Sequence, residues 1–322
     1  MKCIRLLSIA IALFGITIVG TAQTLQEVVD ARNKGSELMA AGNIEQAIIE
    51  FEKCVDLARQ VGEDAEDHSM LVESALPNLY LQVATKLNSA KDYPAAVKAL
   101  EATVAAAEKY KNADVKEKAE KTIPQIFYVM GVADYSAQKY EDAIENLDLA
   151  IARDPGMAGA YFIKGVIYQT LKDEPKMEEN YQLAIEKGTA NGDVANTQKA
   201  RAQLSKFYYN TGILAQRAQK WDEAIAAYLK TIEVDNETEK GDAYYRLASC
   251  FNSKKNWDSA IVNGEKSLEL NPKSTDGIYY ELGTAYAGKN NTAKACEYFK
   301  KVENEPFLKG AKYQIETALK CK

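Results

Sequence analysis

Residues 140–144 read Tyr-Glu-Asp-Ala-Ile, and the pattern returns as Trp-Asp-Glu-Ala-Ile at residues 221–225 and as Trp-Asp-Ser-Ala-Ile at residues 257–261. In each case the alanine lies twelve residues after a glycine or alanine, and four further pairs keep this offset, one of them with methionine in second place. The seven pairs are Gly35 and Ala47, Ala84 and Ala96, Gly131 and Ala143, Gly165 and Met177, Gly212 and Ala224, Ala248 and Ala260, and Gly283 and Ala295. This recurrence predicts an internal repeat of seven units.

The composition favours helices over strands. Of the 322 residues, 47% are hydrophobic and 27% are charged, which is typical of a globular chain that buries a core. Glycine and proline are few, with 18 and 7 residues, whereas alanine, leucine, glutamate and lysine recur throughout. We therefore expect an all-α protein with almost no β-structure.

Charge and histidine content exclude several classes of function. The 40 Lys and Arg residues are outnumbered by 46 Asp and Glu, so the chain has no basic excess for a nucleic-acid backbone. His68 is the only histidine, which removes the usual zinc sites and imidazole-based catalysis. P-loop, GxGxxG, HExxH and GxSxG motifs are absent from the sequence. We expect no enzyme activity, metal, cofactor or nucleic-acid partner.

The first 22 residues have the layout of a secretory signal peptide. Lys2 and Arg5 precede fifteen uncharged, mostly apolar residues, and small residues follow up to Ala22. The rival interpretation is an uncleaved membrane anchor, but the apolar stretch is shorter than the ~20 residues that a spanning helix needs. We therefore expect cleavage after Ala22, export to a periplasm or the cell exterior, and no membrane insertion of the mature chain.

Four cysteines follow the leader, and two interpretations of them remain open. Their spacing matches no zinc motif and no Cys-x-x-Cys pair. We favour buried, small apolar side chains for all four: Cys54, Cys250, Cys296 and Cys321. If one bridge exists, Cys296 and Cys321 are the candidates, because they fall on what should be neighbouring C-terminal helices.

The repeat resembles the tetratricopeptide repeat, a helix–turn–helix unit of about 34 residues with small residues at positions 8 and 20 and aromatic residues at positions 4 and 24. Position 4 holds Ala31, Tyr80, Phe127, Tyr161, Tyr208, Tyr244 and Tyr279. Position 24 holds Phe51, Leu100, Leu147, Tyr181, Tyr228, Gly264 and Phe299. The resemblance implies a right-handed superhelical solenoid of antiparallel helix pairs. In it, small residues allow close helix contact and the ring at position 4 fills the wedge between the helices.

The resemblance also sets expected boundaries. Residues 1–22 are the leader, residues 305–322 form a C-terminal capping helix with Phe307, Tyr313, Ile315 and Leu319 on its apolar face, and the seven units lie between them. Their ranges are about 28–61, 77–110, 124–157, 158–191, 205–238, 241–274 and 276–304.

Units one, two and four carry 13 to 15 extra residues, about four helical turns, which we expect to divide as two turns per helix. Pro77 and Pro124 stand at position 1 of their units, where a proline is tolerated in a first turn. The extra residues before them should lengthen the preceding helix or form a short one. Those of unit four should extend the first helix of unit five. Asp134 and Glu178 stand where the repeat usually has an apolar residue.

In this family the first helices line a concave groove, chiefly through positions 2, 5, 9 and 12. Here positions 5 and 12 of units three to seven are rich in tyrosine and amide side chains, which supply rigid contact area and backbone-pairing groups. We call the candidate binding residues the aromatic stripe: Tyr128, Tyr135, Phe162, Gln169, Tyr209, Gln216, Tyr245, Asn252 and Tyr280. Tyrosine is also common at position 5 across the family, so the stripe is open to an ordinary structural interpretation.

We interpret the chain as a non-catalytic scaffold of the cell envelope that holds an uncharged, extended segment of a partner protein against the stripe. The alternative is a glycan-binding or cell-wall-binding module, since aromatic faces with Asn and Gln amides also hold sugars. The sequence leaves open whether the array pairs with a second copy of itself, and it does not identify the partner.

Overall fold

The computed structural model of the chain describes residues 24–234, 240–270 and 275–322. These residues form helices and no strand, so the predicted all-α class is confirmed for the described part of the chain. The predicted leader, residues 1–22, lies outside it. The chain divides into two compact units, residues 1–123 and residues 124–322, which are taken one at a time.

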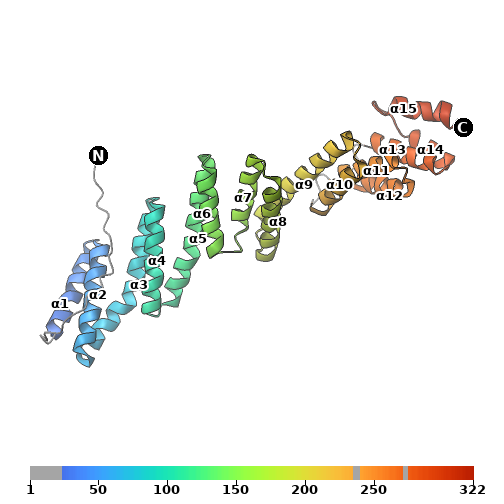
Figure 1. Ribbon diagram of the computed structural model, residues 1–322. Helices are drawn as coiled ribbons and strands as arrows, with labels where there is room; N and C mark the ends of the chain where they lie inside the picture. Colours follow the sequence, from blue (N-terminus) through green and yellow to red (C-terminus); the bar gives the residue numbers. More distant parts are fainter. Residues whose placement is uncertain (1–23, 235–239, 271–274) are drawn as a thin grey trace. The chain divides into compact units, whose positions relative to one another are not determined.

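Helices follow one another in chain order in each unit (Figure 1). The first unit holds α1 (Leu25–Ala40), α2 (Ile44–Val61), the short 3-10 helix Glu63–Ala65, α3 (Glu66–Ser89) and α4 (Tyr93–Lys109). Helix α5 (Ala113–Ser136) begins in the first unit and ends in the second. The second unit continues with α6 (Tyr140–Arg153), α7 (Ala158–Leu171), α8 (Glu174–Asn191), α9 (Val194–Arg217), α10 (Trp221–Val234), α11 (Lys240–Ser253), α12 (Trp257–Leu270), α13 (Asp276–Gly288), α14 (Thr292–Phe299) and α15 (Leu308–Tyr313).

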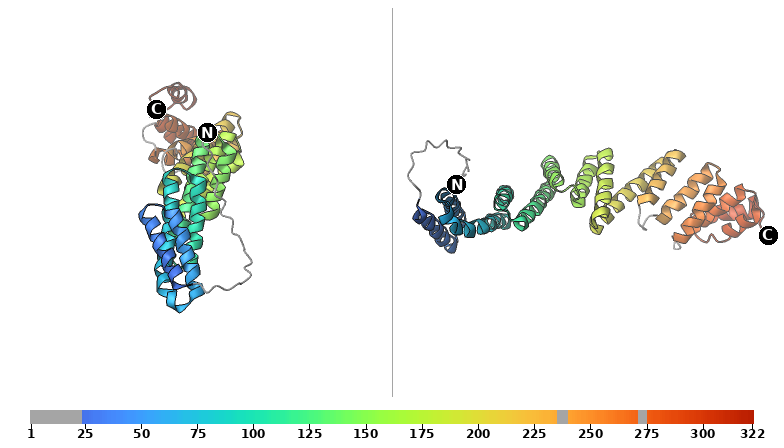
Figure 2. Two further views of the ribbon diagram at one scale, coloured as in Figure 1. Left: turned by 90° about the vertical axis from the view of Figure 1, so that its left-hand side faces the viewer. Right: turned by 90° about the horizontal axis from the view of Figure 1, so that it is seen from below.

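Neighbouring helices pack as antiparallel pairs joined by short turns (Figure 2). The pairs are α1 with α2, α3 with α4, α7 with α8, α9 with α10, α11 with α12, and α13 with α14. Second helices also contact the first helix of the next pair, as α2 contacts α3, α8 contacts α9 and α12 contacts α13. The arrangement is that of a helical solenoid, which buries a core by stacking like units.

Small residues mark where the two helices of a pair meet. A Cβ atom placed on Gly35, Gly165, Gly212 or Gly283 would lie 2.5 to 2.8 Å from the ring at position 24 of the same unit, so only glycine leaves room for that ring. The ring that fills the contact therefore comes from position 24. The ring at position 4 instead lies between successive repeats. The Tyr80 hydroxyl of α3, for example, donates to the Glu52 carboxylate of α2 at 3.0 Å.

Every pair turns through the same backbone conformation. The residue seven positions after the small residue of the first helix has a positive φ, between 58° and 79°. The set is Gly42, Lys91, Gln138, Lys172, Gln219, Lys255 and Asn290. The left-handed conformation ends the first helix, and side chains such as Asp92 and Asp173 then cap the second by accepting its backbone N–H groups.

The extra residues of the long units are divided unevenly between two helices. Helices α2, α4 and α8 have 17 or 18 residues against 14 in α6, α10 and α12, a gain of about one turn. Helices α3, α5 and α9 have 24 residues each against 14 in α7 and α11, a gain of nearly three turns. The expected equal division is wrong. The expected extension of the first helix of unit five, here α9, is found.

The two prolines lie inside helices and not in their first turns. Pro77 is the twelfth residue of α3 and Pro124 the twelfth of α5, so both helices continue through a residue that lacks an N–H donor. An interior proline costs a helix about 3 kcal/mol. Buried apolar side chains in the preceding turns, such as Val72 and Leu76 in α3, offset that cost by packing the extension onto the core. The expectation that each proline lies in the first turn of a helix is wrong for this reason.

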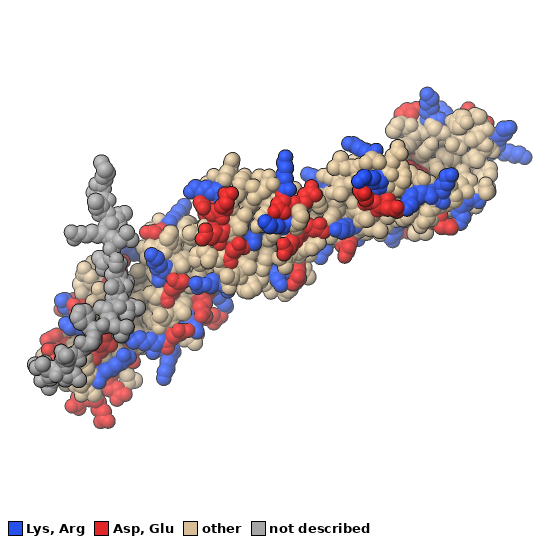
Figure 3. All heavy atoms as spheres, viewed as in Figure 1, with Lys and Arg blue, Asp and Glu red and all other residues tan. Residues whose placement is uncertain are grey.

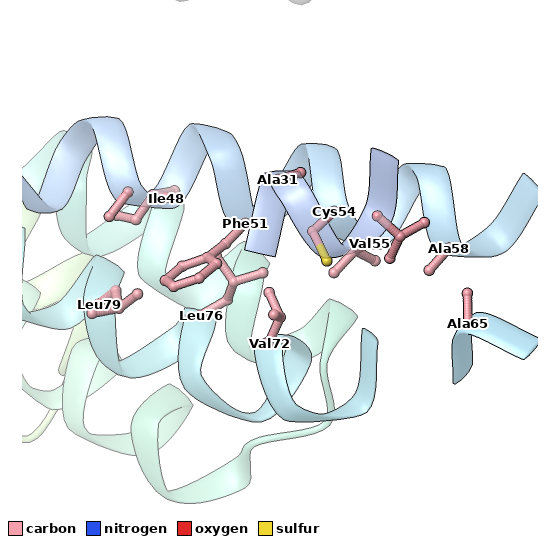
Figure 4. Close-up of a cluster of buried hydrophobic side chains, with 12 residues drawn as sticks. Ala31, Ile48, Phe51, Cys54, Val55, Ala58, Ala65, Val72, Leu76 and Leu79 are labelled. Atoms are coloured by element: carbon pink, nitrogen blue, oxygen red, sulfur yellow. The ribbon is translucent and has the colours of Figure 1, made fainter. Parts of the chain in front are cut away.

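The core of the first unit shows how this burial is achieved (Figure 4). Phe51 and Val55 of α2 point toward Leu76 and Val72 of α3, and all four are at most 4% exposed. Cys54 is free and fully buried among them, as expected. Residues of the predicted extension thus belong to the core and not to a loop.

The C-terminal end differs partly from the expectation. Helix α15 is short and leads into a π-helical turn, Gln314–Ala318. Ile315 and Leu319 pack on the cluster around Phe299, but Tyr313, predicted on the apolar face, is 59% exposed. Cys296 and Cys321 form a disulfide with Cα atoms 5.7 Å apart, so the favoured interpretation of four free cysteines is wrong for this pair and right for Cys54 and Cys250.

Candidate functional site

The nine residues of the aromatic stripe lie on the first helices of the second unit. Helices α5, α7, α9 and α11 each carry two of them, seven residues apart, and α13 carries Tyr280. Seven residues are nearly two helical turns, so both members of a pair share one helix face. Gln169 is exposed, Asn252 is buried, and the other seven are half-buried.

Three outer rings of the stripe rest on rings of the core. Phe162 lies 5.9 Å from Tyr181, Tyr209 lies 5.7 Å from Tyr228, and Tyr280 lies 5.6 Å from Phe299, measured between ring centroids. The inner ring of each pair is at most 1% exposed. One face of each outer ring is therefore fixed by packing, which leaves little rotamer freedom to lose when a ligand contacts the other face.

The two glutamines of the stripe are oriented by the same inner rings. Tyr181 donates its hydroxyl to Gln169 Oε1 at 2.7 Å, and Tyr228 donates to Gln216 Oε1 at 2.8 Å. Burial raises the pKa of both phenols, so they remain hydrogen-bond donors. Because the tyrosine occupies the carbonyl side of each amide, the Nε2 group is directed away from it and has two N–H donors to offer.

Two charged residues that the sequence analysis missed, Arg246 of α11 and Glu281 of α13, lie beside the stripe. Asn252 Nδ2 donates to Glu281 Oε2 at 2.6 Å and to its backbone oxygen at 2.9 Å. Burial raises the pKa of Glu281, although Asn252, Ser249 and the Arg246 charge oppose the shift. Arg246 in turn hydrogen-bonds to Tyr209, so α9, α11 and α13 are linked by polar contacts. The signal in the sequence is that each charge directly follows a stripe tyrosine.

The other end of the stripe opens into a polar cavity of about 290 Å³. Burial and the charge of Asp193 raise the pKa of Tyr128, whose hydroxyl lies beside Gly159. Asn191 Nδ2 donates to the backbone oxygen of Gly156 at 2.9 Å. The cavity is lined by Gln125, Tyr128, Asp154, Gly156, Met157, Ala158, Gly159, Asn191, Asp193 and Asn196.

At the C-terminal end, the last ring of the stripe is already covered. The Phe307 ring lies against the Tyr280 ring, tilted by 38° with centroids 5.7 Å apart, and Gly310 lies against the same tyrosine. Tyr280 therefore does not face an open groove, contrary to the sequence-based expectation, because the C-terminal segment occupies its outer side.

Asp134 and Glu178, which stand where the repeat usually has an apolar residue, form hydrogen bonds within the chain. Asp134 accepts from Asn146 Nδ2 at 2.9 Å. Glu178 accepts from the Tyr208 hydroxyl at 2.5 Å and from Lys230 Nζ at 2.9 Å, which links α8, α9 and α10. Both residues are structural contacts between helices.

The part of the chain that the structure describes contains no group of three or more His, Cys, Asp or Glu side chains able to hold a metal ion. Within the same residues, no helix is both long enough and apolar enough to cross a membrane. Acidic and basic side chains are interspersed on the face drawn in Figure 3, so neither sign forms a large patch there.

Comparison with known proteins gives one consistent result. Sequence models described as the tetratricopeptide repeat match residues 33–61, 128–190, 209–275 and 277–304. Heat shock protein STI1 of Saccharomyces cerevisiae is 31% identical over 110 residues, which cover 34% of this chain and 18% of the yeast protein. Photosystem I assembly protein Ycf3 of Prochlorococcus marinus is 27% identical over 97 residues, which cover 28% of this chain and 56% of Ycf3. The matched region thus spans less than two thirds of either relative.

Two solved structures with some similarity to this chain are also of TPR proteins. The TPR domain of P58(IPK) is 13% identical with a TM-score of 0.34, and the alignment covers 91% of this chain and 98% of that domain. YrrB, described as a TPR protein with an unusual peptide-binding site, is 19% identical with a TM-score of 0.34, covering 63% of this chain and 96% of YrrB.

Proposed function

The chain belongs to the tetratricopeptide repeat family, a family of protein–protein interaction scaffolds, and from this premise we propose that its aromatic stripe binds an extended, uncharged segment of a partner protein. YrrB is described as having a peptide-binding site, and yeast Sti1 has been solved as a TPR-domain complex with pHSP90. The observation that carries the proposal is the pairing of the outer rings of α7 and α9 with the buried inner rings of α8 and α10.

An extended segment suits the chemistry of the stripe. Such a segment has free backbone oxygens along its length, and Gln169 and Gln216 each direct an Nε2 donor group away from the core. The rings Phe162 and Tyr209 supply apolar contact area on the same helix faces as these donors. Aromatic side chains held rigidly before binding cost little entropy when they are covered.

The stripe is suited to a segment with little charge. The Arg246 and Glu281 charges act on one another, so this pair carries no net charge when both side chains are ionised. A strongly acidic or basic segment would meet one unfavourable partner of this pair and would lose its own hydration.

We further propose that the chain works outside the cytoplasm, after removal of residues 1–22. The Cys296–Cys321 disulfide supports this, because such bonds persist in oxidising compartments. Fractionation of cells followed by N-terminal sequencing tests it. A mature chain that begins at Gln23 in the exported fraction is the expected result, and an intact Met1 in the cytosol would contradict it.

A second function has one specific observation in its favour. The cavity beside Tyr128 combines two carboxylates, three amides and a tyrosine, which is chemistry that pairs with sugar hydroxyls. Oligosaccharides and peptides competing for the immobilised full chain separate the two functions. Displacement of the cellular partner by oligosaccharide alone would favour the glycan-binding function.

Crosslinking in intact cells tests the peptide-binding proposal. A photoreactive phenylalanine analogue at Tyr209 should capture a partner, whereas the same analogue at Tyr313, a tyrosine that is 59% exposed and lies outside the stripe, should not. Mass spectrometry identifies the adduct. The same adducts from both positions, or adducts of the array with itself, would show that the stripe is not the binding surface.

A further inference from the structure

The C-terminal segment occupies a place between two rings of the stripe. A Cβ atom on Gly277 would lie 3.0 Å from the Phe307 ring and 3.0 Å from the Tyr245 hydroxyl. A Cβ atom on Gly310 would lie 3.0 Å from the Tyr280 ring. Phe307 thus fits over one glycine of α13, and Tyr280 fits over one glycine of the segment. An aromatic side chain of a partner would need the same space.

The near end of the segment is fixed by Asp276, in the first turn of α13. Its Oδ1 accepts the backbone N–H of Glu303 at 2.6 Å and of Asn304 at 3.3 Å, and its Oδ2 accepts from Asn304 Nδ2 at 2.8 Å. The Asn304 side chain and these backbone donors hold the pKa of Asp276 below its ordinary value, so the carboxylate remains charged. The chain is therefore anchored up to residue 304.

The far end is fixed by the Cys296–Cys321 disulfide, which ties it to α14. Between the two anchors, Ala311 is the one buried residue of 305–320. Apolar burial is the main force that keeps a segment docked, and besides Ala311 it comes here from side chains that are only partly buried, such as Phe307, Ile315 and Leu319. The disulfide consequently determines whether the segment stays on α13.

We propose that residues 306–320 are a plug over the C-terminal end of the stripe, and that reduction of the disulfide releases it to expose a docking face made of Gly277, Tyr280 and Tyr245. The reductant is a dithiol: its two thiols are oxidised to a disulfide while Cys296 and Cys321 take up the two electrons and two protons as thiols. This inference rests on the proposed function of the stripe.

The occupant that fits the freed face is a segment with the chemistry of the plug itself. It has an aromatic side chain, which lies over Gly277, followed three residues later by a glycine, which lies against Tyr280. In the plug these are Phe307 and Gly310. A larger residue in place of that glycine would crowd the Tyr280 side chain, because a Cβ atom at this position would lie 3.0 Å from it.

Hydrogen exchange of the full chain tests the release. With dithiothreitol, or in the C321S variant, amides of residues 308–319 should exchange at least ten times faster, while those of α13 and α14 keep their protection. Dithiothreitol should cause no further change in C321S, which controls for other effects of the reductant. Loss of protection throughout α13 and α14, or continued protection of residues 308–319, would overturn the proposal.

Peptide binding tests the docking face. A fluorescein-labelled peptide with the sequence of residues 306–313 should bind C321S at least ten times more tightly than the oxidised chain, measured by anisotropy. Peptides that carry Phe307→Ala or Gly310→Val are the matched controls and should bind weakly. Equal binding to both forms of the protein would overturn the plug. Release and peptide binding without any crosslink from Tyr209 would instead overturn the proposed function of the stripe and leave the plug intact.

Discussion

Replacement of Gly212 by alanine tests the contact that joins the core to the stripe. A Cβ atom at this position would lie 2.5, 2.7 and 2.9 Å from Cε1, Cδ1 and Cζ of Tyr228, a side chain with no exposed surface. Carbon atoms in contact are normally about 3.5–4.0 Å apart. The ring or the helix must therefore move by about 1 Å, and Tyr209 and Gln216, which contact Tyr228, must move with it.

The expected cost follows from two opposing terms. Overpacking a closed contact costs about 1–3 kcal/mol, whereas alanine in place of glycine favours a helix by about 1 kcal/mol. The free energy of unfolding should fall by about 1 kcal/mol. Urea unfolding followed by circular dichroism measures it, together with hydrogen exchange in α9 and α10, because a repeat array need not unfold in one step.

A double-mutant cycle gives the control. Tyr228→Leu shortens the side chain that meets the new methyl group, so Gly212→Ala should cost less in that background, with a coupling energy of about 1 kcal/mol. If Gly212→Ala instead raises the free energy of unfolding by about 1 kcal/mol, as at an uncrowded helical glycine, then Tyr228 does not fill this contact.

Three further outcomes are expected. Lys172 has a φ of 60°, so Lys172→Val should lower the thermal stability by at least about 1 kcal/mol and Lys172→Gly should not; equal effects would contradict the strained turn. Burial opposes ionisation of Glu178, but hydrogen bonds from Tyr208 and Lys230 outweigh it and hold its pKa below the ordinary 4.5. Its contribution of about 1 kcal/mol is therefore present at pH 7 and lost as the pH falls through that lowered pKa, so urea unfolding of the parent and of Glu178→Gln should converge once the pH lies below it. Tyr228→Phe should cost about 1 kcal/mol and shift the NMR signals of the Gln216 side-chain amide; unchanged signals would show that Tyr228 does not orient it.

The helical fold could be predicted because its decisive contact is local. Position 8 and position 24 of one repeat are sixteen residues apart, and the glycine at position 8 leaves the space that the ring at position 24 fills. Contacts between units are harder to see. Gly264 stands where a ring is usual, and the space is filled by Leu282 from the following helix, which would lie 2.7 Å from a Cβ atom there.

The helix extensions show a second limit. A proline at position 1 of a repeat, such as Pro77, favours a helix that begins there, because the first turn of a helix tolerates proline. The sequence alone does not show that Val72 and Leu76 are both buried, and this burial carries α3 through Pro77. Packing of the helix extension onto the core thus outweighs the cost of about 3 kcal/mol that a proline in the helix interior carries.

The candidate site could be predicted only as a row of residues. Its limits depend on long-range contacts: the polar cavity beside Tyr128 needs the loop before α9, and the covered end at Tyr280 needs the C-terminal segment. Arg246 and Glu281 were missed because scattered charges on a helix look like ordinary surface in a sequence. Their significance comes from contacts between successive repeats, since Glu281 accepts from Asn252 and Arg246 hydrogen-bonds to Tyr209.

The core and the stripe depend on the same side chains, and this restricts where the stripe can form oriented hydrogen bonds. A tyrosine at position 24 occurs only in the units that have glutamine at position 12, namely Tyr181 with Gln169 and Tyr228 with Gln216. Leu147 and Phe299 fill the same core position without a hydroxyl group, so their units cannot fix an amide in this way. Directed donors are therefore confined to α7 and α9, while the neighbouring first helices contribute ring faces. A bound segment should accordingly form its backbone hydrogen bonds with Gln169 and Gln216 in the middle of the stripe, and these bonds should set its register. Its side chains should contact the rings toward the two ends.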